Sequence, residues 1–182
     1  MRTILLGFAA AAIAAIAADA PTPSIGKIVD NQIRLAEREV VSLAEAIPAE
    51  KYGFAPSAGE FEGVRTFSQQ MTHIAAVNFM VASAALGEKN PSEIGPSENG
   101  PASIKGKDAV VTYLKDSFVY AHQAAAALTA ENMLEMMQSP FGSGKSPRMA
   151  IISEITWHTF DHYGQAVVYA RMNGIVPPAS RR

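Results

Sequence analysis

The chain has 182 residues, of which 48% are hydrophobic, and this is enough for one domain with a core of its own. Its formal net charge is −2, so it lacks the positive charge that binding to nucleic-acid phosphates requires, and we expect no nucleic-acid partner. It contains no cysteine, which excludes disulfides, thiolate metal sites and a cysteine nucleophile. A metal ion bound by this chain must therefore have nitrogen and oxygen ligands.

Residues 1–20 are predicted to be a signal peptide. Arg2 precedes an unbroken apolar run, mostly of alanine, over residues 4–18. Ala18-Asp19-Ala20 fits the small-x-small cleavage pattern, and cleavage after Ala17 or Ala18 is the alternative. We expect an exported protein, periplasmic or extracellular, with a mature domain over 21–182 and no membrane contact after cleavage. An uncleaved membrane anchor is the competing interpretation, but the run is shorter than the ~18–20 residues that span a bilayer.

The mature chain has helical periodicity in four segments separated by loops. Apolar residues recur at steps of three and four, which is typical of amphipathic helices, over 24–47, 61–86, 107–128 and 147–173. Ser146-Pro147 is predicted to begin the fourth helix as a cap and first position. Glycine and proline in 88–106 predict a long loop between the second and third helices. No segment shows strand periodicity, so the predicted fold is all-α, a four-helix bundle.

The fourth segment carries His158 and His162 in its apolar stripe. Residues four apart lie on one face of a helix, so both imidazoles can point at one ion. Unpaired buried histidines are costly, and a shared divalent metal explains two in successive turns. His73 in the second segment is the best third ligand, and His122 in the third is its competitor. Three nitrogen ligands leave coordination positions open, as in catalytic zinc sites.

The sequence from His158 to Gln165 resembles a motif of the DinB-like family, H-x-x-x-H-x-G-Q. Arg171, Gly174 and Pro177 continue the pattern, and the resemblance extends from about Gly26 to Pro178. It implies a four-helix bundle, often dimeric, with His73, His158 and His162 as metal ligands. It also implies an activity related to thiol-dependent transferases, or to the hydrolases and isomerases of the family. One departure is Tyr163, where family members often have arginine.

Four further residues are candidates for the surroundings of the metal. Gln165 and Asp161 are candidates to hydrogen-bond the second nitrogen of a ligand histidine, which would fix its tautomer, with a solvated charge as the alternative for Asp161. Glu154, one turn before His158, is a candidate base or extra ligand, with an exposed surface charge as the alternative. His122 is a candidate pocket group or a structural residue.

The sequence indicates no catalytic residue and leaves three functions open. The first is a metal-dependent hydrolase or thiol transferase acting on a small molecule. The second is a non-catalytic metal-binding protein, and the third is a structural helical module in which the metal site only holds the helices together. Export argues against thiol transfer, because low-molecular-weight thiols are chiefly intracellular. We expect zinc or nickel as the metal, with manganese or iron as alternatives, since all four accept imidazole.

Overall fold

Four long helices account for most of the structure, a computed structural model that describes residues 22–181. The predicted signal peptide and its cleavage site therefore lie outside the described residues. The helices are α1 (Ile25–Ala46), α2 (Phe67–Leu86), α3 (Lys107–Ala126) and α4 (Arg148–Met172). Three single 3₁₀ turns are η1 (Ala49–Lys51), η2 (Pro96–Glu98) and η3 (Pro178–Ser180). The prediction of an all-α four-helix bundle is confirmed.

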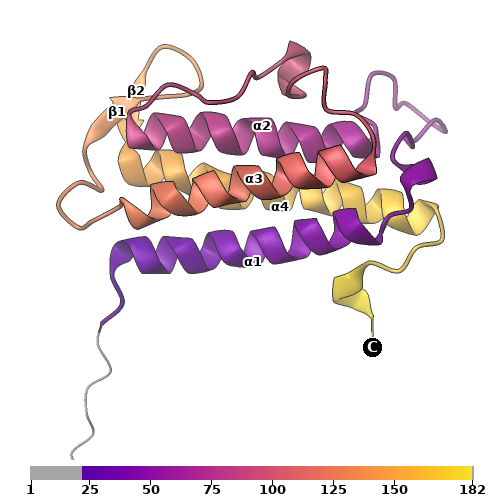
Figure 1. Ribbon diagram of the computed structural model, residues 1–182, viewed down its shortest axis with the longest axis horizontal. Helices are drawn as coiled ribbons and strands as arrows, with labels where there is room; N and C mark the ends of the chain where they lie inside the picture. Colours follow the sequence, from indigo (N-terminus) through magenta and orange to yellow (C-terminus); the bar gives the residue numbers. More distant parts are fainter. Residues whose placement is uncertain (1–21, 182) are drawn as a thin grey trace, which may run out of the picture.

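The long loop between α2 and α3 determines the topology of the bundle. Figure 1 shows this loop returning along the length of the molecule, so that α2 and α3 run in the same direction and α1 and α4 in the other. Each of α1 and α2 packs against both α3 and α4, which makes α1 and α2 a diagonal pair. The loop carries η2 over the first half of α2, where His73 lies.

The first two helices begin at side-chain caps. Ser24 Oγ accepts from the Lys27 N–H, and Thr66 and Gln69 form a reciprocal capping box. The predicted start of the second helix at residue 61 is wrong, because residues 61–66 lie in a loop before the Thr66 cap. Gly63 has a φ of 76° there, a conformation that continues no helix.

A two-stranded hairpin, which the sequence reasoning missed, precedes α4. Strand β1 (Met136–Gln138) pairs antiparallel with β2 (Lys145–Pro147). Pro147 is thus the last strand residue, opposite Met136, and α4 begins at Arg148 without a side-chain cap. The predicted Ser146 cap is wrong, because Ser146 pairs with Met137 in the hairpin.

The core is built mainly on α2, which is buried on most of its sides. The largest fully buried apolar side chains come from all four helices and the adjoining turn: Phe67, Phe118, Ile33, Leu43, Ile47, Met71, Ile74, Leu114, Ile151, Ile152 and Ile155. Removal of these apolar side chains from water is the main stabilising contribution to such a bundle.

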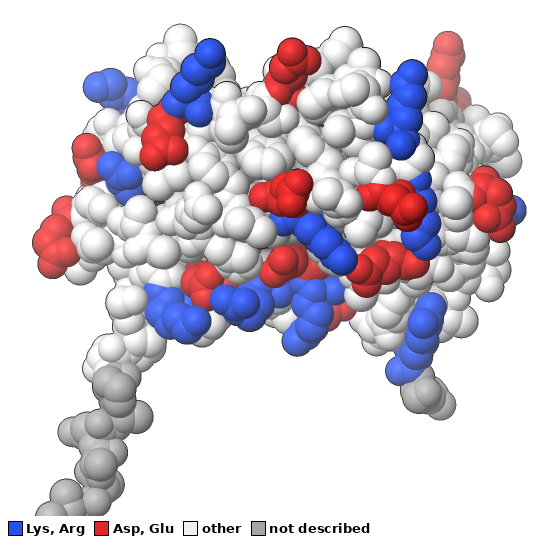
Figure 2. Space-filling view, viewed as in Figure 1, with Lys and Arg blue, Asp and Glu red and all other residues white. Residues whose placement is uncertain are grey.

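The surface view shows acidic and basic side chains interspersed over α1 and α3, without a large patch of one sign on that face (Figure 2). Among the described residues, no helix has both the length and the apolar character needed to cross a membrane.

Candidate metal centre

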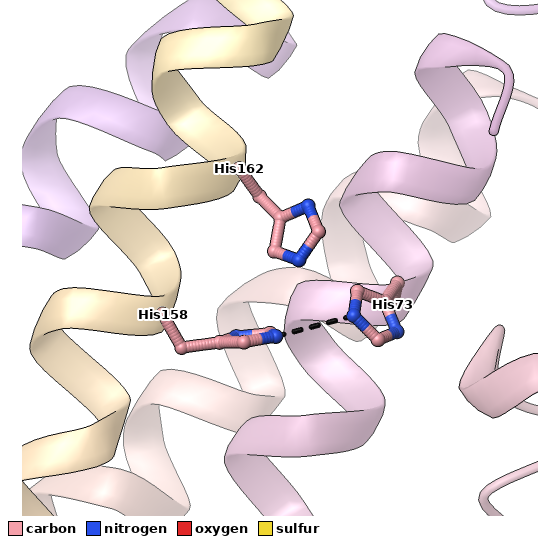
Figure 3. A group of neighbouring side chains, drawn as sticks. All are labelled: His73, His158 and His162. Atoms are coloured by element: carbon pink, nitrogen blue, oxygen red, sulfur yellow. Dashed lines mark hydrogen bonds between the residues drawn. The ribbon is translucent and has the colours of Figure 1, made fainter. Parts of the chain in front are cut away.

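Packing of α4 against α2 brings three of the four histidines together. His158 and His162 extend from successive turns of α4 toward His73 on α2 (Figure 3). The three ring centroids are 4.5 to 4.9 Å apart. One ring nitrogen from each lies within 4.8 Å of the others. The three residues are therefore positioned to bind one metal ion.

The loop between α2 and α3 fixes the tautomer of His73. Its Nδ1 lies 2.8 Å from the carbonyl oxygen of Glu98, which only accepts, so Nδ1 carries the hydrogen. The lone pair of Nε2 is then free for a metal. Ser97 and Glu98 both adopt left-handed φ angles, 54° and 57°. That conformation costs about 1 kcal/mol or more per non-glycine residue, so contacts such as this one must hold it in place.

A chain of side-chain hydrogen bonds fixes the tautomer of His162. It begins at the Asp161 carboxylate, which accepts from Gln165 Nε2 at 3.1 Å. Gln165 Oε1 accepts from Gln70 Nε2 at 3.1 Å, and Gln70 Oε1 accepts from His162 Nδ1 at 2.6 Å. Because the carboxylate only accepts, every amide in the chain has a defined orientation. The lone pair of His162 Nε2 is again the one left for a metal.

The predicted hydrogen bond from Gln165 or Asp161 to a ligand histidine is not found among the described residues, because Gln70 occupies that position at His162; Gln165 and Asp161 lie one and two residues further along the same chain of hydrogen bonds. Gln70 is 2% exposed, and the sequence reasoning did not select it. The sequence does contain a feature that points to Gln70. A polar residue three positions before His73 shares its helix face, on a helix that is otherwise largely apolar.

His158 differs from the other two histidines. Its Nε2 is 3.1 Å from His73 Nε2, as the dashed line in Figure 3 marks. Since His73 Nε2 bears a lone pair, these two nitrogens attract one another only through a shared proton or cation. His158 Nδ1 is buried and has no hydrogen-bond partner among residues 22–181, and the same holds for Oε2 of Glu154, one turn earlier.

Burial favours the neutral form, which a metal ligand requires, in all three histidines by lowering the pKa of each ring. Burial lowers the pKa of His158 to about 3, with the neighbouring His162, His73 and Arg65 acting in the same direction. Burial lowers the pKa of His162 to about 4, and His73 and Arg65 add to the effect while Asp161 opposes it. The pKa of His73 is also lowered by burial. Proton competition for the cluster is therefore weak near neutral pH.

Two of the other candidate residues, His122 and Glu154, are not part of the histidine cluster. His122 does not reach the cluster. Its Nδ1 lies 2.7 Å from Asp30 and its Nε2 3.1 Å from Glu37, both on α1, so it joins α3 to α1. Glu154 is half-buried, and burial raises the pKa of its carboxyl. Within residues 22–181, the histidine cluster is the one group of possible ligands that converges closely enough to hold a metal.

Comparison with known proteins agrees with this architecture. The family model described as the DinB superfamily matches residues 32–166. No curated protein matches significantly.

Solved structures with the same fold include a DinB-like protein from Bacillus cereus, with a TM-score of 0.65 and 16% identity, covering 82% of this chain and 93% of that one. A conserved protein from Enterococcus faecalis has a TM-score of 0.65 and 13% identity, covering 83% and 98%. A DinB-like protein from Bacillus subtilis has a TM-score of 0.59 and 17% identity, covering 85% and 99%. At these identities the likeness shows the fold alone, whereas the family model extends over most of the described chain. The chain therefore belongs to the DinB superfamily.

Proposed function

We propose that this protein is an exported metalloenzyme that binds a divalent ion through His73, His158 and His162 and transforms a small molecule by hydrolysis or group transfer. The observation that carries the proposal is the fixed tautomer of two of the three rings. The Nδ1 atoms of His73 and His162 are committed to Glu98 and Gln70, so both Nε2 lone pairs are left for a cation.

The donor set favours a metal that accepts imidazole nitrogen. Zinc and nickel are the first candidates and manganese and iron the alternatives, because no carboxylate belongs to the cluster. When bound, a divalent ion supplies Lewis acidity that activates water or a thiol near neutral pH. The protein's part is to orient the rings of His73 and His162 through Glu98 and Gln70, and to lower the pKa of both rings by burying them.

The predicted export supports hydrolysis over thiol transfer, because low-molecular-weight thiols are chiefly intracellular. Amino-terminal sequencing of the protein recovered from periplasm or medium tests this part of the proposal. A start between Ala18 and Pro21 is expected, and a membrane-bound chain that retains Met1 contradicts it. The dimer implied by the family resemblance is measured on the same sample by light scattering.

Elemental analysis of four purified proteins tests the metal centre: the wild type, His73→Ala, His158→Ala and His122→Ala. We expect a stoichiometric divalent metal in the wild type and in His122→Ala, because His122 pairs with Asp30 and Glu37 of α1 and is not part of the cluster. Metal should be lost from the other two variants. Full metal content in His158→Ala would show that the ligand assignment is wrong.

A non-catalytic role for the metal is the second candidate, and the burial of the site favours it. His73 is 4% exposed and His162 8%, which suits an ion that only joins α2 to α4. Cobalt substitution distinguishes the two functions. If added azide changes the visible spectrum of the cobalt protein, a coordination position is open and catalysis is supported. An unchanged spectrum favours the structural role.

A further inference from the structure

A polar pocket of about 430 Å³ lies beside the histidine cluster. Gln70 and Gln165, which orient His162, form part of its wall. Ser97 and Asn99 line it too, on either side of the residue whose carbonyl holds His73. The pocket is thus separated from two of the three histidines by single hydrogen-bonding residues.

Two of the side chains around this pocket, Asn99 and Gln69, offer donors, because their amide oxygens already accept hydrogen bonds. Asn99 Oδ1 accepts from Arg65 Nε at 2.8 Å, so the Asn99 amide N–H groups remain. Gln69 Oε1 accepts from the Thr66 N–H at 2.9 Å, which leaves the Gln69 amide N–H groups in the same way. None of the residues that line the pocket is acidic. Such a set of donors suits an anionic oxygen group.

Arg65 adds a positive charge to the wall of the polar pocket. Its guanidinium donates to Asn99 Oδ1 and to the Ser97 carbonyl, both neutral, and three of its five N–H groups remain available. Within residues 22–181, no acidic side chain lies at ion-pair distance from it. Its two partners, Ser97 and Asn99, flank Glu98, whose carbonyl accepts from His73 Nδ1, so hydrogen bonds to one short loop segment connect Arg65 with the proposed metal centre.

An apolar groove of about 230 Å³ adjoins the polar pocket, and the two share Val64 and Gln165 in their walls. Its other walls include Phe61, Val168 and Met172, which are 45%, 51% and 53% exposed. Isolated exposed apolar residues are ordinary, but these line one groove that opens beside the charged pocket.

We infer that this combined cleft binds a small monocarboxylate with an apolar chain. The carboxylate pairs with Arg65 and the amide donors of Gln69 and Asn99, and the apolar chain lies in the groove formed by Phe61, Val168 and Met172. The inference rests on the proposed function in one respect, since it takes this carboxylate compound to be the substrate or product of the metal centre. Planar guanidinium matches carboxylate geometry in two hydrogen bonds, which favours this anion.

Calorimetric titration of the wild-type protein with hexanoate, hexanamide and acetate tests the inference without a variant. Hexanoate should bind roughly tenfold or more tightly than hexanamide, because the amide has the same shape without the charge. It should also bind about tenfold more tightly than acetate, because its longer chain reaches the groove. Equal affinity for hexanoate and hexanamide, or no hexanoate binding, would overturn the inference.

Substitutions test the charged pocket and the apolar groove of the cleft separately. Arg65→Gln should weaken hexanoate binding roughly tenfold and remove the preference over hexanamide, and Arg65→Lys should restore part of it. Val168→Asn should abolish the preference over acetate. Lys115→Gln, which removes an equal charge from α3, should change nothing. If Arg65 only holds the 97–99 loop, Arg65→Gln weakens both hexanoate and hexanamide equally, and the inference is wrong.

The same titrations on metal-loaded and metal-free protein separate this inference from the proposed function. Metal content is measured independently on each sample. Selective hexanoate binding by a protein that takes up no metal would support the cleft and overturn the metalloenzyme. Stoichiometric metal without hexanoate selectivity would support the metal centre and overturn the cleft.

Discussion

Gln70 gives the sharpest test of how the metal centre is built. It is 2% exposed, and its side chain joins His162 to Gln165. Gln70→Met keeps the length of the side chain and removes both hydrogen bonds. The His162 Nδ1–H, held at 2.6 Å in the wild type, then loses its acceptor. Loss of such an orienting partner typically lowers metal affinity about 10–100-fold, equivalent to roughly 1.4–2.7 kcal/mol.

The assay is competition for Zn²⁺ between the protein and a chelator of known affinity. Gln70→Glu is the rescue variant, because a carboxylate still accepts from His162 Nδ1 and makes the ring a stronger ligand. We expect Gln70→Met to bind weakest, with Gln70→Glu at least as tight as the wild type. The order would be reversed if the role of Gln70 were only to fill space, since Met is the better match for an apolar site.

Asn78→Leu is the matched control for Gln70→Met. Asn78 is also a buried amide of α2, and it donates to Ser117 Oγ at 3.2 Å, away from the cluster. The control loses one hydrogen bond, while Ser117 keeps its own to the Leu114 carbonyl at 2.7 Å. It should therefore lose only about 0.5–1.5 kcal/mol of stability and keep its zinc affinity. Equal losses of zinc affinity in the two variants would refute the reasoning, because general loosening of α2 would then explain both.

Two further predictions concern stability. In metal-free protein the folded-state pKa of His162, about 4, lies below the unfolded value near 6.5, so the unfolded state binds more protons between these values. The contribution of His162 to the free energy of unfolding should therefore be complete above pH 7, and about 3 kcal/mol of it should be lost on going to pH 4. Urea unfolding measures this dependence, and a free energy of unfolding that does not change with pH would contradict the burial of this ring. Gly26→Ala should cost roughly 1–3 kcal/mol, because its Cβ would lie 2.6 Å from the Ala125 carbonyl oxygen and 2.7 Å from that of Leu128. Gly164→Ala, with open space around the new methyl, should instead raise the melting temperature, and similar effects at both glycines would argue against the close packing of α1 on α3.

The four helices could be predicted because apolar residues recur along each of them at steps of three and four. The same spacing led to an error at the start of α2. Phe61 and Val64 fit the helical period but are 45% and 37% exposed, on a loop that lines the apolar groove. Periodicity records where apolar residues recur and does not say whether they are buried against the core. The hairpin before α4 was missed because each strand has only three residues, too few to establish a period of two.

The cluster of three histidines was predicted largely because two of them are local to one helical turn. The separation of His122 from the cluster was not predictable in the same way, since it depends on how α3 is rotated about its axis. Asp30 and Glu37, which flank His122, lie more than 80 residues away in the sequence. The contacts that Ser97, Glu98 and Asn99 make at the site could not be predicted either, because a loop's contacts depend on its course over the folded bundle.

The charge balance of the site links its metal chemistry to its ligand. Three neutral imidazoles leave the charge of a divalent ion uncompensated, unlike a ligand set that contains carboxylates. Arg65 adds a further positive charge, and its own partners Asn99 and Ser97 are neutral. Among the described residues no carboxylate belongs to the histidine cluster, and Asp161 is joined to His162 only through Gln165 and Gln70. An anionic ligand is therefore the group that best completes this site, whether it arrives as substrate or leaves as product.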